Sequence, residues 1–377
     1  MKLITVLLKT TDECNFRCQY CYHADTQYVT GRMSMQLFEE IVSKIASCYN
    51  FVHLTFHGGE PLIMGSDFYE KAFATIKKYS DNGVQWDLGI QTNGYFLDEK
   101  YCELFESNNC GISISYDGPG QLNRLRDRTE EVTENIIRLR NKGYKISLLG
   151  VVTKQNVQHL RVFYDFAKKH SCPCKLNPVF ECGGAVGHND FLISPEEFTA
   201  GLRDLLPVFL KDDTLDSFFV PFTSLVYSAV TDKPAPICEN VGCLHKWLAI
   251  THDGFIYPCS RSYTNEYCLG NISDYSEIDE AFATDNFARL LKGAIERRNY
   301  CKNNCNYYHL CQGGCNNDSL LNGDLTRPAN FKCKILKSIV PYIKDYLEAH
   351  KDEIRNKHVL DVIKRSSYGK HNDQRNM

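Results

Sequence analysis

The sequence has no long apolar run and almost no excess of charge. None of its 377 residues falls in an apolar stretch of about 18 residues, so no segment is expected to cross a membrane. The apolar run at residues 3–8 is too short for a signal-peptide core, and no small-residue cleavage site follows it. The formal charge of −3 argues against a protein built to coat nucleic acid. We therefore expect a cytoplasmic protein that binds neither membranes nor nucleic acid.

Tryptophan and methionine are scarce, at 2 and 5 residues, whereas cysteine is abundant at 18. Hydrophobic residues make up 43% of the chain, an ordinary share for a globular protein long enough for two or three domains. In a reducing compartment so many cysteines indicate metal binding rather than disulfides. Eleven of them fall into two arrays. The remaining seven are expected to be ordinary thiols: Cys48, Cys102, Cys110, Cys172, Cys174, Cys182 and Cys268.

The N-terminal array has the spacing Cys-x3-Cys-x2-Cys, formed by Cys14, Cys18 and Cys21. One short loop can present three thiolates with this spacing. A cubane 4Fe–4S cluster takes four ligands, so three thiolates leave one iron open to a small molecule. A zinc knuckle is the alternative, but zinc loops usually use Cys-x2-Cys pairs and need a fourth protein ligand. No role is assigned to His23 or His57, because satisfaction by a backbone carbonyl explains either equally well.

Strands and helices alternate from residue 1 to about 215. Ser66 is expected to cap the second helix, and residues 194–197 begin another with a capping box. Six strand–helix units predict a parallel sheet, either doubly wound or closed as a barrel, with the site at the carboxyl ends of the strands. The strands are expected at residues 3–8, 51–57, 85–90, 111–116, 145–152 and 175–180.

Polar segments follow the second, third and fourth strands. Gly58-Gly59-Glu60-Pro61 follows the second: paired glycines allow close backbone approach to a ligand, and Glu60 can accept a hydrogen bond from an ammonium group. Gln91-Thr92-Asn93-Gly94 is a turn suited to hydroxyl groups. Ser115 and Asp117 share one face of the fourth strand. Each segment alone is ordinary turn chemistry, but their order downstream of the cysteine loop indicates one binding site.

The second array follows a helical bridge whose turn-rich end, at residues 231–236, marks a domain boundary. Within the array a small hairpin is expected around Asp253-Gly254. A helix is expected at 335–349, and the last ten or so residues of the polar tail are expected to fray. Two structural zincs or two iron–sulfur clusters would both satisfy the eight cysteines: Cys238, Cys243, Cys259, Cys301, Cys305, Cys311, Cys315 and Cys333.

The N-terminal array and the polar segments together resemble the motifs of radical S-adenosylmethionine (SAM) enzymes. In such enzymes the open iron binds the amino and carboxylate groups of SAM, and reductive cleavage gives a 5′-deoxyadenosyl radical that takes a hydrogen atom from the substrate. The resemblance implies an α/β fold with a partial (β/α)6 TIM-like barrel over residues 1–215. It also implies a SAM amine site at Gly58, Gly59, Glu60 and Pro61, with Asn93 and Ser115 near the ribose and carboxylate.

The second array resembles the SPASM domain of radical SAM peptide and protein maturases. The resemblance implies a bridge at 216–236, a SPASM domain at 237–340, and a C-terminal helix and tail at 341–377. The Cys301-x3-Cys305 spacing is one residue longer than usual. Two closed auxiliary 4Fe–4S clusters, suited to electron transfer, would bring the total to three. Cys238, Cys243, Cys259 and Cys315 would hold the first, and Cys301, Cys305, Cys311 and Cys333 the second.

The resemblance leaves two activities open, each typical of one group of these maturases. Anaerobic sulfatase-maturating enzymes oxidise a Cys or Ser to formylglycine and carry an Asp base directly after the cysteine of the Gly-x4-Cys motif. Ser260 stands there in this chain, and a serine hydroxyl is no base near neutral pH without a partner. The missing base favours the second group, which installs crosslinks or oxidations in ribosomally made peptides. A zinc-rich interaction protein would explain only the second array.

The resemblance also implies partners. The substrate would be a precursor peptide or protein, and the electron donor a protein such as flavodoxin or ferredoxin. Because the chain begins at the first barrel strand, we expect a separate protein, or the barrel and bridge themselves, to hold a leader peptide.

Overall fold

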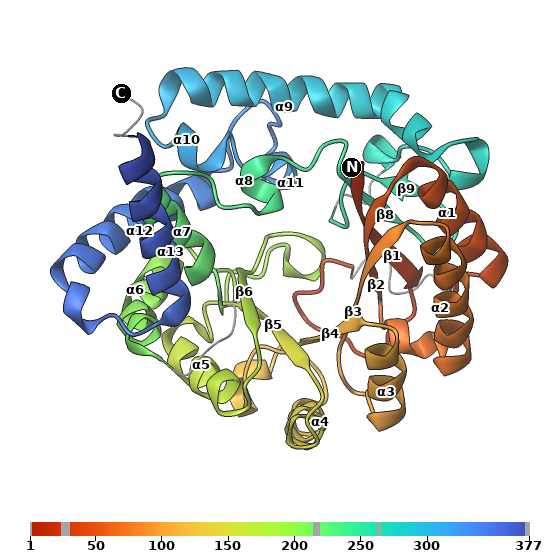
Figure 1. Cartoon of the computed structure of the whole chain (residues 1–377), viewed down its shortest axis with the longest axis horizontal. Coiled ribbons are helices and arrows are strands. Elements are labelled where there is room, and N and C mark those ends of the chain that lie inside the picture. Colours follow the sequence, from red (N-terminus) through yellow and green to blue (C-terminus); the bar gives the residue numbers. More distant parts are fainter. Residues whose placement is uncertain (1, 24–30, 214–218, 262–264, 374–377) are drawn as a thin grey trace.

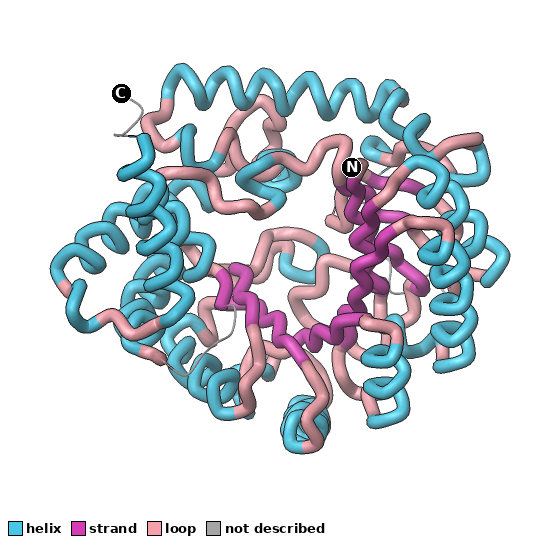
Figure 2. The backbone as a smooth tube through the Cα atoms, in the orientation of Figure 1, coloured by secondary structure: helices cyan, strands magenta, loops and turns pink. Residues whose placement is uncertain are grey.

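The computed structural model describes residues 2–23, 31–213, 219–261 and 265–373. Its strands form one nine-stranded sheet in the order β7-β6-β5-β4-β3-β2-β1-β8-β9. The sheet curves into an open half-barrel with the strands inside and the helices outside (Figures 1 and 2). The predicted α/β fold with a partial barrel is confirmed.

The first six strands are parallel, and each pairs with the next in the chain. Ile4, Val6 and Leu8 of the first strand are fully buried and pack in one core with helix residues such as Phe38. The residues between them face the inside of the half-barrel, as the strand period of two requires. All six predicted strands are present, with ends shifted by a few residues: β1 (Leu3–Thr11), β2 (Phe51–Gly58), β3 (Gln85–Thr92), β4 (Cys110–Ser115), β5 (Ile146–Val152) and β6 (Cys174–Pro178).

Outer helices connect these strands. Ser194 and Glu197 form the predicted capping box at the start of the sixth helix. The predicted cap at Ser66 is wrong: Gly65 takes the N-cap position with no side-chain bond, and Ser66 is already the first helical residue. The helices are α1 (Met35–Cys48), α2 (Ser66–Asp81), α3 (Glu99–Ser107), α4 (Thr129–Asn141), α5 (Leu160–Lys169) and α6 (Pro195–Lys211).

The C-terminal half adds strands to both edges of the sheet. The predicted hairpin is present as β8 and β9, which pair antiparallel. The sequence did not reveal that β8 also pairs in parallel with β1, with Thr5 opposite Trp247. This half contains β7 (Phe219–Val220), α7 (Phe222–Thr231), α8 (Cys238–Val241), β8 (Trp247–Ile250), β9 (Ile256–Tyr257), α9 (Asp285–Asn304), α10 (Tyr308–Cys311), α11 (Asn316–Leu321), α12 (Asn330–Ala349) and α13 (Lys357–Asp373).

The polar C-terminal segment contains a helix that the sequence did not reveal. α13 extends to Asp373 and packs against α7, with Val359 fully buried. The expected fraying of the last ten or so residues stays a prediction, and residues 374–377 lie outside the described part. Short 3-10 helices connect other elements: η2 (Pro61–Met64), η3 (Gly120–Asn123), η4 (Val157–His159), η5 (Gly183–Ala185), η6 (Asn265–Tyr267), η7 (Ile272–Asp274), η8 (Ile278–Ala283) and η9 (Lys351–Glu353).

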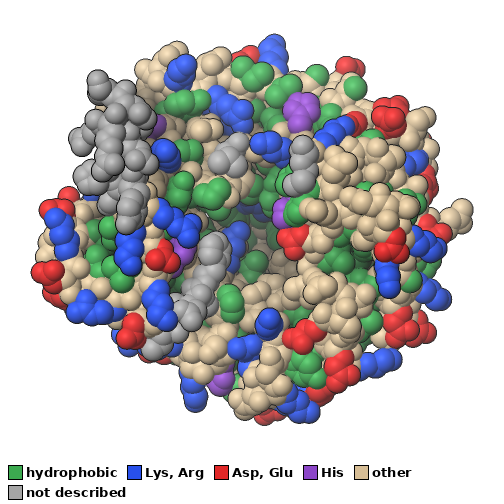
Figure 3. Space-filling model, in the orientation of Figure 1, with side chains coloured by type: hydrophobic (Ala, Val, Ile, Leu, Met, Phe, Trp, Pro, Cys, Tyr) green, Lys and Arg blue, Asp and Glu red, His purple; other side chains and the backbone are tan. Residues whose placement is uncertain are grey.

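The arrangement leaves a hollow inside the half-barrel. Helices α8, α10 and α11 lie across the open side of the sheet (Figure 1). The space-filling view in the same orientation shows a recess at the centre of this face (Figure 3). Among the residues that the structure describes, none of the helices has both the length and the apolar character needed to span a bilayer.

Candidate active site

The N-terminal cysteines lie in the loop that leaves β1. Burial raises the pKa of Cys14 to about 12 and that of Cys18 to about 11, and the neighbouring cysteines of the loop add to both shifts. The backbone N–H of Phe16 donates to Cys14 Sγ over 3.4 Å, and the N–H of Cys21 donates to the carbonyl of Cys18 over 3.1 Å. The structure thus brings the three predicted thiols together in one partly buried loop.

The glycine segment after β2 is joined to the start of this loop. The N–H of Gly59 donates to Thr11 O over 2.9 Å, and that of Glu60 donates to Glu13 O over 2.8 Å. A Cβ at Gly58 would lie 2.3 Å from Thr11 O, and one at Gly59 would lie 2.3 Å from Glu13 O. Both distances are too short for any side chain. The glycines therefore allow the cysteine loop's own backbone to approach, in addition to any approach of a ligand.

Glu60 is buried and points into the protein. Its Oε1 accepts from Leu62 N–H over 2.9 Å and from the Thr92 hydroxyl over 2.7 Å, and its Oε2 accepts from Asn93 N–H over 2.7 Å. Burial raises the pKa of Glu60 to about 7, while these three donors oppose the shift. The visible role of the carboxylate is to cap η2, which begins at Pro61, and to fix the turn after β3. Its predicted contact with the SAM amine stays a prediction.

Asn93 and Ser115 extend the same network. Asn93 Nδ2 donates to Asn15 Oδ1 over 2.8 Å, which ties the turn after β3 to the cysteine loop. Gln91 Nε2 donates to Ser115 Oγ over 3.3 Å at the ends of β3 and β4. The carboxyl ends of three neighbouring strands are thus bonded either to the loop or to one another, as a site at this edge requires.

Sequence reasoning missed a half-buried cation beside this loop, Arg126. Arg126 Nη1 donates to the Tyr20 hydroxyl over 3.1 Å, and that hydroxyl donates to Asp117, which also accepts from Val151 N–H over 2.8 Å. Arg126 Nε is buried without a hydrogen-bond partner among the described residues. The positive charge of Arg126 also lowers the pKa of Cys18, although burial has the larger, opposite effect. A guanidinium with a buried, open Nε–H suits a carboxylate, and SAM carries one. No local motif marks Arg126, so it could not be identified from the sequence.

The C-terminal cysteines gather into two sets of four. Burial raises the pKa values of Cys238, Cys243 and Cys315, and the nearby Cys259 adds to all three shifts. Burial likewise raises those of Cys301, Cys311 and Cys333, and Cys305 adds to them. These are the two sets that the resemblance to the SPASM domain implies. A cavity of about 130 Å³ is lined by Cys311, Cys315 and Cys333, which come from both sets.

The chemistry of the side chains bears on what these sets would hold. Thiolates are ligands of both structural zinc and iron–sulfur clusters, and all eight cysteines are free of disulfides. Four thiolates complete a cubane cluster, one on each iron. The two sets of four therefore have the donors that two such clusters take.

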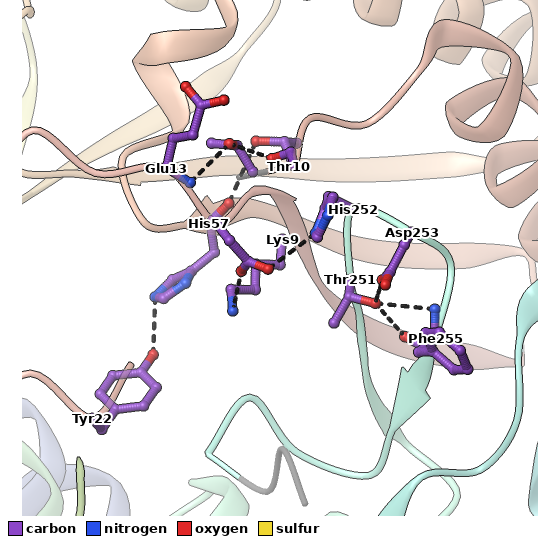
Figure 4. A network of polar contacts seen from close by, with 12 residues as sticks. Lys9, Thr10, Glu13, Tyr22, His57, Thr251, His252, Asp253 and Phe255 are labelled. Atoms are coloured by element: carbon purple, nitrogen blue, oxygen red, sulfur yellow. Dashed lines mark hydrogen bonds and ion pairs between the residues drawn. The ribbon is translucent and has the colours of Figure 1, made fainter. Parts of the chain in front are cut away.

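A polar network lines the inner face of β1 and β2 (Figure 4). At one end of it the Tyr22 hydroxyl lies 3.4 Å from His57 Nε2, and Ser260 lies near the same hydroxyl. Burial, with the nearby charge of Lys9, lowers the pKa of His57 to about 4, so its imidazole is neutral at pH 7. Asp12 pairs with Lys9 and, over 3.1 Å, with His252. The position after Cys259 is thus held by a serine close to Tyr22 and not by a carboxylate.

Comparisons with known proteins agree with this geometry. Residues 8–167 match the model of the radical SAM superfamily, and residues 238–315 match that of the SPASM iron–sulfur cluster-binding domain. A cysteine-type anaerobic sulfatase-maturating enzyme of Clostridium novyi is 29% identical over 90% of this chain and 94% of its own. A serine-type enzyme of Bacteroides thetaiotaomicron is 26% identical over 91% and 90%.

Solved structures share the fold. The structure of anSMEcpe with bound AdoMet has a TM-score of 0.83 at 23% identity, covering 96% of this chain and 98% of its own. Streptococcus suis SuiB bound to its precursor peptide SuiA has a TM-score of 0.65 at 14% identity, over 87% and 75%. At these identities the likeness concerns the fold alone.

Proposed function

The chain is a radical SAM enzyme with a SPASM domain, and from that premise we propose that it modifies a side chain of a ribosomally made peptide, installing a crosslink or an oxidation. When bound, the N-terminal cluster and SAM would supply the 5′-deoxyadenosyl radical that removes a hydrogen atom from that side chain. The observation that carries the proposal is the convergence of the three loop thiols with the glycine segment and Arg126 at the carboxyl end of the half-barrel.

Different residues of the loop and its surroundings would bind the cluster and the separate groups of SAM. Cys14, Cys18 and Cys21 would hold the cluster and leave one iron for SAM. Arg126 would pair with the carboxylate of SAM through its open Nε. The segment from Gly58 to Pro61 would meet the amine, with Asn93 and Ser115 beside the ribose. The two C-terminal sets would hold two further 4Fe–4S clusters, three in all, and a flavodoxin or ferredoxin would supply the electron.

A peptide substrate suits the recess at the centre of the half-barrel (Figure 3). Two proteins of the same fold have been solved with peptides: anSMEcpe with the Kp18Cys peptide and SuiB with SuiA. The preference for a ribosomally made peptide rests on residue 260. A serine stands there, close to Tyr22, where formylglycine formation would call for a carboxylate base.

Formylglycine formation is the second candidate, and the relatives favour it. The similarity in sequence to enzymes named sulfatase-maturating extends over about nine tenths of the chain, at 29% identity to the cysteine-type enzyme and 26% to the serine-type enzyme. In this candidate His57 would accept the proton of the substrate, because its imidazole is neutral and lies 3.4 Å from the Tyr22 hydroxyl, near Ser260.

The two candidates differ in the product that they form. The anaerobically reconstituted enzyme would be incubated with SAM and dithionite and with two substrates: the short peptides encoded beside its gene, and synthetic sulfatase peptides that carry Cys or Ser. Mass spectrometry with and without an aminooxy reagent reads the product. We expect a gene-neighbour peptide to lose hydrogen atoms without forming an aldehyde. An aldehyde in the sulfatase peptide would replace the first candidate by the second, and an unchanged mass in both would contradict a peptide substrate.

A further inference from the structure

An arginine guanidinium contacts one of the C-terminal cysteines. Arg261 follows Cys259 by two residues, and its Nη2 donates to Cys315 Sγ over 3.4 Å. Its Nη1 donates to Asp318 Oδ1 over 2.9 Å. The other oxygen of Asp318 pairs with Lys332 Nζ over 3.2 Å. One carboxylate therefore holds two cations beside the first set of thiols.

This charged group is buried and held in place. The Asp318 side chain is 5% exposed and that of Arg261 is 20% exposed. Burial raises the pKa of Asp318, but the charges of Lys332 and Arg261 outweigh it and keep the pKa below its usual value, so the carboxylate stays ionised. The ring of Phe180, just past the end of β6, lies 4.5 Å from the Arg261 guanidinium and 5.5 Å from Lys332 Nζ. Such packing fixes the guanidinium and shields it from water.

A second donor reaches the same set from another direction. Asn316 Nδ2 donates to Cys243 Sγ over 3.5 Å. The amide is oriented by Arg297, a fully buried residue that donates to Asn316 Oδ1 and, over 2.9 Å and 2.7 Å, to the carbonyls of Gly313 and Leu325. Two of the four sulfurs of this set thus receive a side-chain N–H, one of them from a cation.

We propose that Arg261, balanced by Asp318, sets the reduction potential of the iron–sulfur cluster held by Cys238, Cys243, Cys259 and Cys315. Reduction adds one electron to a cluster that four thiolates already make negative. A cation and an N–H donor at a ligand sulfur stabilise the reduced form and so raise the potential. The inference rests on the proposed auxiliary cluster and is independent of the substrate and of the bond formed.

The test compares substitutions that change the local charge in opposite directions, in the full-length, anaerobically reconstituted protein. Arg261→Gln removes the positive charge, Asp318→Asn removes the negative charge at nearly constant shape, and Arg289→Gln removes an exposed arginine of α9 as the control. Potentials are measured by electron paramagnetic resonance during titration with dithionite. Added SAM identifies the signal of the N-terminal cluster, because only that cluster would bind it.

We expect Arg261→Gln to move one auxiliary potential to more negative values, Asp318→Asn to move it to more positive values, and Arg289→Gln to leave it unchanged. Shifts in the same direction for the first two, or shifts no larger than that of the control, would overturn the proposal. If the Arg261→Gln variant does not retain the cluster, the proposal is tested with Arg261→Lys, which keeps the charge and is expected to keep the potential near that of the wild type, and with Asp318→Asn, which is expected to raise it. A wild-type protein with only about four irons would overturn it as well, while leaving the chemistry of the N-terminal cluster intact.

Discussion

Some residues of the candidate active site are hydrogen-bonded to other residues of the same chain and so fix the shape of the site. Glu60 shows this most clearly, because three donors surround a carboxylate that the sequence suggested would face a ligand. Two of these donors are backbone N–H groups, from Leu62 and Asn93. A backbone N–H cannot rotate to find another acceptor, and leaving it unpaired in the interior costs free energy. A donor at the position of the carboxylate would therefore be unfavourable.

Replacing this acceptor gives a first prediction. In Glu60→Gln one side-chain oxygen becomes an NH₂ group that faces a donor. We expect the free energy of unfolding to fall by about 1–3 kcal/mol, the usual cost of an unsatisfied buried group. Urea denaturation of the cluster-free protein measures it, and Glu70→Gln, at an exposed position of α2, is the control. Equal stability of Glu60→Gln and the wild type would show that the carboxylate is not needed as an acceptor.

His57 gives a prediction on pH. Burial, with the charge of Lys9, lowers the pKa of its imidazole from 6.5 to about 4, whereas the unfolded chain binds the proton near 6.5. Between these values the unfolded state holds more protons, so the stability of the fold decreases as the pH falls from 6.5 to 4. The total loss from this residue is about 3 kcal/mol.

The variant His57→Asn isolates this contribution. It cannot titrate, and it keeps a polar group beside Tyr22. We expect its stability to fall less steeply over the same pH range, with the remaining slope due to other groups such as His23, whose pKa burial also lowers. Parallel stability curves for the variant and the wild type would contradict the account.

At the scale of elements, the end of β2 and the start of the cysteine loop form one unit. Backbone bonds from Gly59 and Glu60 hold the loop at Thr11 and Glu13, and no side chain fits between the two segments. The geometry of the cysteines therefore depends on a segment more than 35 residues away in the sequence, as the numbers of Cys21 and Gly58 show.

Gly59→Ala tests this dependence. Its Cβ would lie 2.3 Å from Glu13 O, so the loop must shift. We expect the reconstituted variant to lose about four irons, the content of the N-terminal cluster, and to melt at a lower temperature. Gly111→Ala in β4 is the matched control, because its Cβ meets nothing closer than 3.7 Å. Full iron content in Gly59→Ala would show that the loop does not need this contact.

Helices and strands could be predicted from the sequence where hydrophobic residues recur at a regular spacing or a local capping motif is present. The six strands and the capping box at Ser194 follow from periodicity and local chemistry. β7 has two residues, too few for any periodicity, and the pairing of β8 with β1 depends on how distant segments meet. The two cysteine sets were expected from the resemblance to the SPASM domain, whereas Arg126 and Arg261 could not be singled out in the sequence, because their partners are distant in it.

At the scale of the whole molecule, one sheet joins the two halves of the chain. β8 leads from the first auxiliary set and pairs with β1, which leads into the N-terminal loop. The opposite edge ends at β7, and beyond it α12, which carries Cys333, packs on α6 and α7. All three thiol sets are thus fixed to a common frame, which suits a reaction that moves an electron between them and a substrate in the recess.

The proposed function depends on radical chemistry at the loop of Cys14, Cys18 and Cys21. The yield of 5′-deoxyadenosine from SAM and dithionite tests this dependence, with iron analysis of the same samples. We expect about twelve irons and steady product for the wild type, and about eight irons with no product for Cys18→Ala. Product formation by Cys18→Ala, or its absence from a wild type with full iron content, would show that the loop does not carry the radical chemistry.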